Sequence, residues 1–579
     1  MIDWLAPLVL IGAALVLVSV LTSVLAFRFG APLLLVFLLI GLVAGEDGFG
    51  LAYNDQSGAY LIGSVALAII LFDAGFNTKW RVFRKVAAPA ITLATLGVVF
   101  TTGLVGAAAH YLFDLNWPQA LLLGALISST DAAAVFFLLR AGGITLRERV
   151  RSTLGVESGS NDPIAIFLAI TLVELIAQPT GLAGFTAQIL LGFAVSMGLG
   201  VALGIGGGYL LIRLLNAIEL EAGLYPIFVL AGALLLFALT GQIGGSGFIA
   251  VYVAGLVAGN QSVPHVAALR RFQDGMTWLA QILMFLVLGL LATPSAFADI
   301  ALQAIALGLF LMLIARPVAV GLCLLPFGFT FKETAFIGWV GLRGAVSILL
   351  AILPFLGGLD GSQLFFNVAF IVVLTSLLIQ GWTIKPMAKW LGIIVPRQIG
   401  PVDKIELELP GTAHHELVVY HVMPGSPIVT GARLPRWARP ALVLRDGHSM
   451  HFRKAGRLQP DDYIYIFMSP RYASALDHLF AGPREEASSE VDRYFGDFAI
   501  SADARLSTLV DVYGARVAAD EQHFSAADYL ARHLRRYELG DRVDLDAIEL
   551  IIREIGADNQ ITQVGISFKN GEKKAQVST

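Results

Sequence analysis

A short polar stretch with two carboxylates opens an otherwise apolar segment, VESGSNDPIAIFLAIT at residues 156–171. Glu157 and Asn161 are four residues apart, and so are Ser158 and Asp162. Side chains at this spacing lie on the same face of a helix, so these oxygen-bearing groups are expected to face one side. Oxygen ligands suit hard alkali cations, and no His or Cys cluster nearby favours a transition metal. The stretch predicts a cation site; the alternative is that Glu157 and Asp162 only hold helices together.

Four further ionisable residues fall within long apolar segments: Asp73, Asp131, Arg316 and Arg343. A charge at the centre of a bilayer costs roughly 2.5–3.5 kcal/mol on insertion scales, so such residues persist mostly where a bundle interior or a water cavity needs them. Asp73 ends a span, and a helix-capping role is weighed equally with a role at the site. Arg316 precedes Pro317 and is interpreted as a kink or helix-end charge as readily as a ligand.

Arg343 is the expected counter-charge for Glu157 or Asp131, which leaves Asp162 free to exchange its load. An ionised carboxylate without a cation or a partner is costly to bury. Asp162 is therefore predicted to hold either a proton or a metal cation whenever the site switches from one side of the membrane to the other. Alternating access is expected to come from movement of the helices that carry the site.

The composition indicates a membrane protein. Hydrophobic residues make up 56% of the 579 and charged residues 14%, against about 25% charged in an ordinary soluble domain. The single Cys323 excludes a disulfide framework and a thiolate metal site, and the formal net charge of -4 indicates no particular partner. Apolar windows long enough to cross about 30 Å of hydrocarbon predict thirteen transmembrane helices, at residues 5–27, 31–46, 59–77, 86–112, 118–139, 153–177, 184–212, 224–242, 246–260, 273–292, 298–325, 333–354 and 363–385.

Among the connections between these windows, only alternate ones carry Lys and Arg. Arg28 and the basic residues within 79–85 and 140–151 lie in such connections. The intervening loops, such as GEDGFGLAYNDQSG and TPSAFAD, carry only acidic or neutral residues. Because short cytoplasmic loops hold the basic residues of membrane proteins, the N-terminus is predicted to be periplasmic and the C-terminal part cytoplasmic.

Thirteen helices divide as six, one and six, which leaves the second set of six inverted relative to the first. Inverted repeats are typical of secondary transporters, whose sites lie where corresponding helices of the two halves are broken. The fifth window contains GALISSTDAAAVF, with Thr130 and Asp131 at its centre. The twelfth contains IGWVGLRGAVSI, with Gly341 and Gly344 around Arg343. Helices five and twelve are therefore predicted to be discontinuous.

Four motifs of this sequence occur together: Thr130-Asp131, ESGSNDP at 157–163, GGSGFIAVYVAGLVAGN at 244–260 and GLRGAVS at 341–347. As a set they resemble the monovalent cation/proton antiporter superfamily, in its sodium/proton exchanger branch, which includes bacterial potassium/proton antiporters with cytosolic tails. The resemblance implies a thirteen-helix fold with a core and a dimerisation domain, crossed broken helices and a homodimer.

The resemblance also implies a role for each matching residue. Asp162 would be the ion- and proton-binding carboxylate, with Ser158 and Thr130 close to the cation. Asp131 would steady the broken helix ends, whose dipoles point at one another. Asp73 falls at the family's acidic position on helix three, in a motif that departs from the usual residues around it.

Two further implications concern charge. Glu157 would pair with Arg343. Asn161 fills the place that an acid takes in the electrogenic branch of the superfamily, and an Asn-Asp pair implies electroneutral one-for-one exchange.

After Pro396 the sequence changes from apolar spans to short strands and polar turns. We therefore predict an all-α polytopic transmembrane antiporter domain over residues 1–395, followed by small α/β cytosolic domains. Residues 396–481 resemble a TrkA-C-like domain and 491–579 a CorC-like transporter-associated domain, joined by a polar linker at 482–490. No G-x-G-x-x-G follows a strand, so a dinucleotide cofactor is not expected. The tail is expected either to bind a small effector such as a nucleotide or to reinforce the dimer.

The leading hypothesis is a multi-pass protein of the bacterial inner membrane that exchanges K⁺ for H⁺, with no cofactor, no enzymatic reaction and no nucleic acid partner. Sodium/proton exchange is the second hypothesis, because these ligand types separate the two ions poorly. An ion channel would leave the exchange carboxylates unexplained. An intramembrane aspartyl protease using Asp131 and Asp162 would need a G-x-G-D sequence, which is absent.

Overall fold

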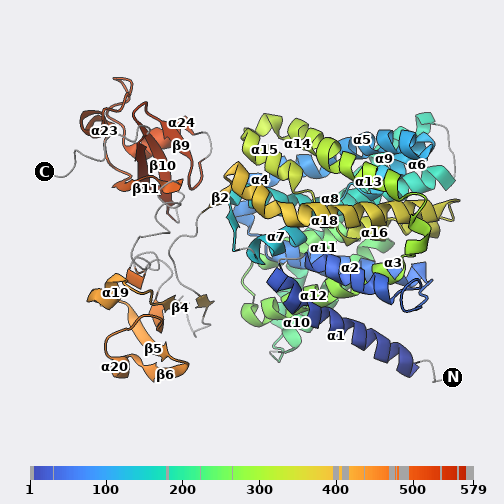
Figure 1. Cartoon of the computed structure of the whole chain (residues 1–579), viewed down its shortest axis with the longest axis horizontal. Helices are drawn as coiled ribbons and strands as arrows, with labels where there is room; N and C mark the ends of the chain where they lie inside the picture. Colours follow the sequence, from blue (N-terminus) through green and yellow to red (C-terminus); the bar gives the residue numbers. More distant parts are fainter. Residues whose placement is uncertain are drawn as a thin grey trace. The chain divides into compact units, whose positions relative to one another are not determined.

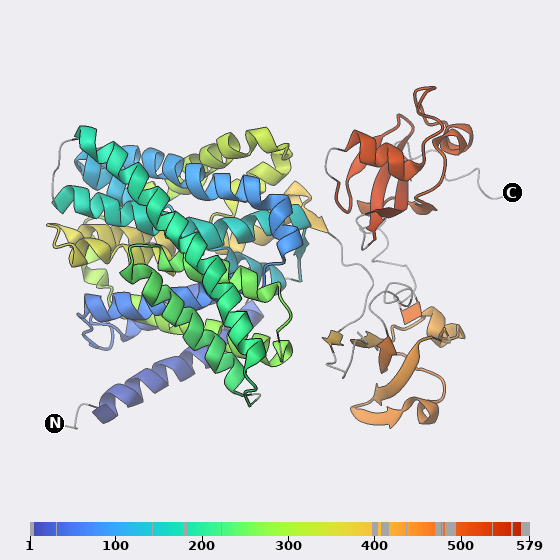
Figure 2. The same ribbon diagram turned by 180° about the vertical axis from the view of Figure 1, so that it is seen from behind.

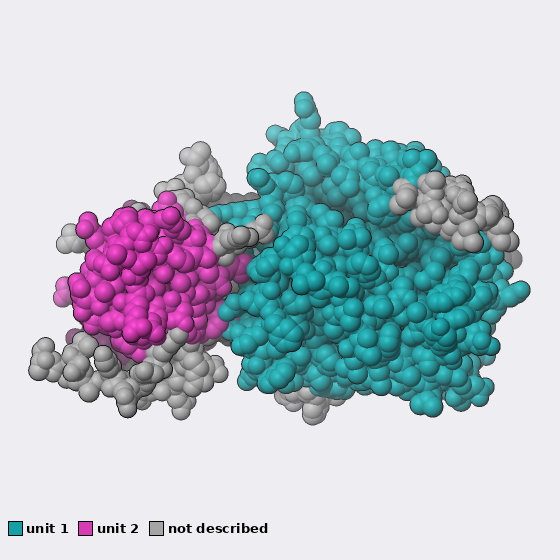
Figure 3. All heavy atoms as spheres, turned by 90° about the horizontal axis from the view of Figure 1, so that it is seen from above, with its two compact units in different colours: residues 1–394 teal, residues 395–579 magenta. Residues whose placement is uncertain are grey.

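Long apolar helices form most of the first 394 residues of the computed structural model (Figure 1). The chain divides into two compact units, residues 1–394 and 395–579 (Figure 3). The sequence stretch predicted as a linker, 482–490, lies outside the described residues. The structure describes residues 5–29, 32–141, 143–177, 182–221, 223–263, 265–395, 403–406, 416–435, 437–468, 476, 479–480, 494–534, 537–556 and 560–568.

The helices of the first unit follow the predicted windows. Its N-terminal part consists of α1 (Leu5–Phe29), α2 (Leu33–Ala44), α3 (Gln56–Phe76), α4 (Trp80–Thr92), η1 (Leu93–Gly97), α5 (Val98–Phe113), α6 (Trp117–Leu126), α7 (Ala132–Ala141) and α8 (Glu148–Ala177). Its C-terminal part consists of α9 (Leu182–Ala217), α10 (Leu224–Gln242), α11 (Gly247–Gly259), α12 (Val266–Leu290), η2 (Pro294–Phe297), α13 (Ala301–Phe310), η3 (Leu311–Ala315), α14 (Arg316–Leu324), η4 (Leu325–Phe327), α15 (Phe331–Trp339), α16 (Ala345–Leu350), α17 (Leu353–Leu356) and α18 (Ser362–Leu391).

Each predicted window overlaps one helix or a run of consecutive helical elements. Within the described residues, eight helices are long and apolar enough to cross a membrane. The 36-residue α9 runs diagonally across the face of this unit seen in Figure 2. The prediction of a polytopic helical membrane protein is therefore confirmed.

Small residues let α11 lie close against α3. A Cβ at Gly255 would overlap the backbone oxygen of Phe72, and one at Gly75 would overlap the backbone oxygen of Tyr252. Small residues at such crossings allow two membrane helices to approach backbone to backbone. The GGSGFIAVYVAGLVAGN motif therefore packs helices together, and it does so next to the span that carries Asp73.

Two spans each contain a short π-helix. η1 joins α4 to α5, and η3 joins α13 to α14. These are the fourth and eleventh predicted spans, which correspond to each other when the helices divide as six, one and six. Pro317 accounts for the second case, because it cannot donate a hydrogen bond to the carbonyl four residues earlier. Short π-helical turns occur frequently at functional sites, and η3 ends directly before Arg316.

The fifth and twelfth spans are broken, as predicted. α6 ends at Leu126 and α7 begins at Ala132, whereas α15 ends at Trp339 and α16 begins at Ala345. Each interruption covers about one turn. Each therefore leaves backbone groups that have no partner within their own helix, in the interior of the helix bundle. Non-helical backbone is tolerated at membrane depth only where protein or a water-filled cavity surrounds it.

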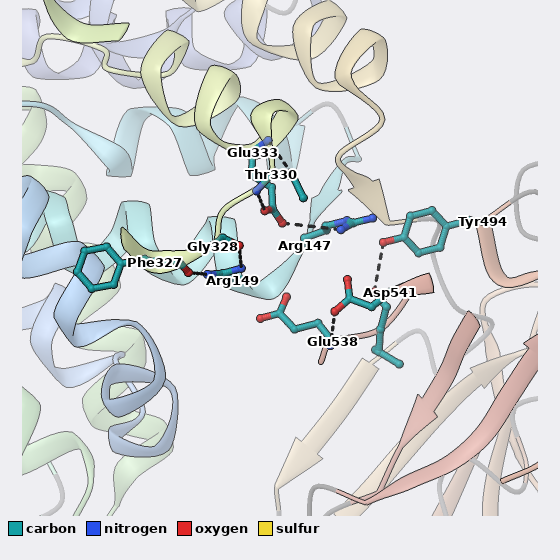
Figure 4. Close-up of polar contacts among 10 residues, drawn as sticks. Arg147, Arg149, Phe327, Gly328, Thr330, Glu333, Tyr494, Glu538 and Asp541 are labelled. Atoms are coloured by element: carbon teal, nitrogen blue, oxygen red, sulfur yellow. Dashed lines mark hydrogen bonds and ion pairs between the residues drawn. The ribbon is translucent and has the colours of Figure 1, made fainter. Parts of the chain in front are cut away.

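The beginning of α8 is tied to two other segments. The short strand β1 (Thr145–Leu146) pairs with β2 (Ile394–Val395), which follows α18. Arg147 lies 3.7 Å from Glu333, which forms a capping box with Thr330 at the start of α15. Arg149 donates to the backbone oxygens of residues 327 and 328, at 2.6 and 3.2 Å (Figure 4). The start of α8 is thus bonded to both the start of α15 and the end of the last membrane helix.

Two antiparallel sheets build the second unit, and each has its own apolar core. The first has the strand order β3-β4-β7-β5-β6 and the second β8-β11-β10-β9. Elements of the first are β3 (Asp403–Glu406), β4 (Glu416–His421), α19 (Pro427–Thr430), β5 (Arg439–Arg445), β6 (His448–His451), α20 (Phe452–Ala455) and β7 (Tyr463–Met468). Elements of the second are β8 (Phe498–Ser501), α23 (Leu506–Tyr513), α24 (Ala526–His533), β9 (Arg542–Asp544), β10 (Ile548–Ile555) and β11 (Ile561–Phe568).

An ion pair between Arg445 and the buried carboxylate of Asp462 stabilises the turn before β7. Asp462 accepts hydrogen bonds from Arg445 Nε at 2.8 Å and Nη2 at 2.7 Å, and from the backbone N–H of Gln459 at 2.8 Å. Burial opposes ionisation of Asp462, but these hydrogen bonds outweigh it and hold the pKa of the carboxyl below its usual range. The ionised carboxylate therefore stabilises the five-stranded sheet.

Replacing Asp462 with Asn is expected to destabilise this sheet by about 1–3 kcal/mol at neutral pH, because Arg445 loses a charged partner. Since the pKa is lowered by folding, the contribution is present above about pH 4 and is lost as the pH falls through the lowered value. Amide hydrogen exchange of the full chain in detergent would measure it. The difference between wild type and variant should appear in β5 and β7 and shrink as the pH approaches 3, whereas β10 and β11 should exchange equally in both.

Candidate functional site

The two helix breaks lie against each other inside the first unit. The backbone N–H of Asp131, in the α6–α7 break, donates to the carbonyl of Leu342, in the α15–α16 break, at 2.8 Å. A Cβ at Gly344 would overlap the carboxyl group of Asp131, so only glycine fits there without displacement. The fold thus brings Thr130-Asp131 into direct contact with the Gly-Leu-Arg-Gly motif at 341–344, although the two motifs are more than 200 residues apart in the sequence.

Asp162 faces this crossing from the middle of α8 and is 5% exposed. The hydroxyl of Ser129 donates a hydrogen bond to its Oδ1. One residue earlier, Asn161 Nδ2 donates to Thr130 Oγ1 at 2.6 Å. Asn161 Oδ1 has no hydrogen-bond partner among the described residues. A carboxylate, an amide group and two hydroxyls therefore meet at the break between α6 and α7.

Ser158 and Asp131 complete the N-terminus of α7. Ser158 Oγ accepts from the N–H of Ala132 at 3.1 Å and donates to the carbonyl of Thr130 at 3.0 Å. Asp131 Oδ1 accepts from the N–H of Ala134 at 3.1 Å. A helix N-terminus has unpaired N–H groups that such side chains satisfy. These contacts hold the break in a fixed shape beside Asp162.

The expected pairing of Glu157 with Arg343 is wrong. Glu157 Oε1 lies 2.6 Å from Arg316 Nη2, and both side chains are almost fully buried. Arg343 instead donates from Nη1 to the carbonyl of Ser129 at 2.7 Å. The physical reason is local: Arg343 lies in the non-helical break, where its side chain faces the opposite break, whereas Arg316 follows η3 at the start of α14.

Residues of α18 hold the second break. The backbone N–H of Arg343 donates to Ser376 Oγ at 3.1 Å, and Ser376 Oγ donates to Gln380 Oε1 at 2.6 Å. Gln380 Nε2 in turn donates to the carbonyl of Trp339, the last residue of α15, at 2.6 Å. Neither Ser376 nor Gln380 was singled out from the sequence. Their spacing of four residues is the signal that places both on one face of α18.

Asp73 lies outside this hydrogen-bond network in the described residues. It accepts from Asn77 Nδ2 at 2.9 Å, one turn before α3 ends. Asp274 on α12 is within electrostatic range of it. The structure therefore does not bring Asp73 into contact with Ser129, Thr130 or Asp162.

The model of the sodium/hydrogen exchanger family, transmembrane, matches residues 13–390. The chain belongs to this family. It is 42% identical over 565 residues to the K(+)/H(+) antiporter NhaP2 of Shewanella baltica (strain OS223), with 96% of this chain and 97% of the relative covered. It is 40% identical over 565 residues to the K(+)/H(+) antiporter NhaP of Alkalimonas amylolytica, covering 96% and 98%. These relatives are transporters, so the prediction that the chain is not an enzyme is confirmed.

A solved structure has the same fold. The sodium proton antiporter MjNhaP1 from Methanocaldococcus jannaschii at pH 8 superposes with a TM-score of 0.59 at 22% identity. The match covers 67% of this chain and 99% of that chain. The predicted superfamily is confirmed by the family model and the relatives, and the solved structure shows the same fold. For this sodium/hydrogen exchanger family member, the crossing at Asp162 is the candidate exchange site.

Proposed function

We propose that this protein exchanges K⁺ for H⁺ across the membrane by alternating access, with Asp162 binding both ions in turn. The observation that carries the proposal is the crossing of two helix breaks at a buried carboxylate, beside the hydroxyls of Ser129 and Thr130 and the amide of Asn161. Hard alkali cations are bound by oxygen ligands of this kind. The two relatives named K(+)/H(+) antiporters align with nearly the whole chain, tail included, which favours K⁺.

The charges of the side chains at the site favour the binding of a single positive charge at a time. Asn161 is neutral, Asp131 caps α7, and Glu157 is neutralised by Arg316. Asp162 is then the carboxylate left to hold a proton or a cation. An ionised carboxylate without a bound cation is costly at membrane depth. The site therefore switches sides only when Asp162 holds a proton or a cation. Exchange is therefore one-for-one and electroneutral in this proposal.

The remaining roles follow from the same geometry. Ser158 and Thr130 lie near the cation, and Asp131 and Asn161 keep the break in shape. Arg343 supports the break through its hydrogen bond to the carbonyl of Ser129. Asp73 supports the end of α3, where it accepts a hydrogen bond from Asn77. Neither a resident metal nor an organic cofactor takes part; K⁺ and H⁺ are the substrates.

The proposal extends to the protein's setting. It is a homodimer in the inner membrane of a bacterium, with a periplasmic N-terminus and cytoplasmic C-terminal domains. Residues 396–481 act as a TrkA-C-like domain and 491–579 as a CorC-like domain. Their two separate apolar cores support a tail of two modules. In this proposal the tail either binds a small effector such as a nucleotide or reinforces the dimer.

Proteoliposomes test the choice of cation. With an imposed pH gradient, we expect K⁺ and Rb⁺ to collapse the gradient at lower concentrations than Na⁺. Clamping the membrane potential at different values should leave the rate unchanged if exchange is electroneutral. A lower half-saturating concentration for Na⁺ would replace this assignment by sodium/proton antiport, the function named for the structural neighbour. Empty vesicles of the same lipid serve as the background.

A further inference from the structure

Ser129 contacts two functional groups at once. Its hydroxyl donates to Asp162 Oδ1, and its backbone carbonyl accepts from Arg343 Nη1 at 2.7 Å. The residue is 3% exposed and belongs to the non-helical break between α6 and α7. It therefore connects the candidate exchange carboxylate to the Arg of the opposite break.

The oxygen of the Ser129 hydroxyl has spare bonding capacity. A hydroxyl offers one donor and two acceptor lone pairs. The hydroxyl donates to Asp162, and within the described residues no group donates a hydrogen bond to the hydroxyl oxygen of Ser129. Ser158 differs, because its oxygen already accepts from the N–H of Ala132 while its proton goes to the carbonyl of Thr130. Ser129 is thus the less committed of the two serines.

Two backbone oxygens near Asp162 each accept one hydrogen bond, which leaves each of them a single lone pair. The carbonyl of Ser129 accepts from Arg343, and that of Thr130 accepts from Ser158. A cation that leaves water must have its hydration shell replaced by protein oxygens. Of the two side-chain hydroxyls in the break that bond with α8, Thr130 Oγ1 accepts a hydrogen bond from Asn161, whereas Ser129 Oγ donates to Asp162 and accepts none within the described residues.

We propose that Ser129 is a further ligand of the transported cation: its hydroxyl oxygen contacts the cation while its O–H continues to donate a hydrogen bond to Asp162. Arg343 holds the carbonyl of Ser129 and so fixes the backbone from which this hydroxyl projects. This inference rests on the proposed function and adds a ligand to the same site. It assigns to Arg343 the role of a positioning residue rather than that of partner to Glu157.

Variants of Ser129 test the assignment in proteoliposomes. Ser129→Ala removes the oxygen, so the half-saturating K⁺ concentration should rise about tenfold while the maximal rate stays within about twofold. Ser129→Cys keeps the size of the side chain but offers a soft sulfur, which alkali cations bind poorly, and should behave like the Ala variant. Ser129→Thr retains the hydroxyl and should restore the wild-type value. Ser128→Ala is the matched control, because this neighbouring buried hydroxyl donates to the carbonyl of Ala125.

An unchanged half-saturating concentration in Ser129→Ala, or a fall in maximal rate alone, would overturn the proposal in favour of a structural role. If the Ala variant does not fold, the Cys variant decides by the same criterion. The wild type is measured with both K⁺ and Na⁺, so a protein that exchanges only Na⁺ refutes the potassium assignment while Ser129 is still judged from Na⁺. If no exchange is seen, calorimetric titration of the purified full chain with Rb⁺ decides: weaker binding to the Ala variant supports the ligand, and equal binding overturns it.

Discussion

Replacing Asp162 with Asn should reduce cation-dependent proton movement to the level of empty vesicles. Asn has nearly the same shape and can still bond with Ser129, but it carries no negative charge and takes up no proton. The variant therefore keeps the packing of α8 against the break while it loses the group that both substrates need. Fluorescence of a pH dye inside proteoliposomes, recorded as K⁺ is added, measures the loss.

Asp360→Asn is the matched control for this variant. Asp360 is an exposed carboxylate between α17 and α18, and its removal should leave exchange unchanged. Both variants should elute from a sizing column as the wild type does. Residual exchange by a well-folded Asp162→Asn protein at a rate near that of wild type would remove this aspartate from the mechanism.

Breaking the ion pair between Glu157 and Arg316 should have the largest effect on stability. The two side chains are 1% and 3% exposed and lie 2.6 Å apart, so neither has water as an alternative partner. Removing one member of a buried pair typically costs about 3–5 kcal/mol, because the other charge is left without compensation. Glu157→Gln is therefore expected to lower the unfolding midpoint strongly in an SDS titration of the protein in mixed micelles.

A double-mutant cycle identifies the partner. If Arg316 is the partner, Glu157→Gln with Arg316→Gln should be less destabilised than the sum of the single variants, by about 1–3 kcal/mol. The parallel cycle with Arg343→Gln should give a smaller coupling, since Arg343 bonds to the carbonyl of Ser129. A larger coupling between positions 157 and 343 than between 157 and 316 would contradict the pairing seen here.

The sequence was sufficient to predict where the membrane helices break. Thr130-Asp131 and the glycines around Arg343 are polar or flexible residues within apolar windows, and both interruptions occur there. The convergence of the α8 polar groups on one side also follows from helical spacing, as the contacts of Ser158, Asn161 and Asp162 illustrate. Local chemistry and periodicity carry this much information because neither depends on distant residues.

The partner of Glu157 could not be derived in the same way. Arg316 and Arg343 are equally plausible as counter-charges by residue type, and only the rotation of each helix decides between them. That rotation depends on η3 and on contacts made after the helices assemble. Ser129 was missed for a related reason, because a serine in a membrane helix is unremarkable until the break turns it toward Asp162.

The π-helical turn before Arg316 constrains the number of residues in its span more than their identity. A π-helical turn closes with i→i+5 hydrogen bonds and so holds one residue more than an α-helical turn, which closes with i→i+4 bonds. Loss of a single residue from Leu311–Ala315 would therefore convert this segment to regular α-helix and remove the irregular turn that directly precedes Arg316. An evolving sequence can exchange one apolar side chain for another along this segment, but shortening it would remove the irregular turn from which Arg316 reaches Glu157.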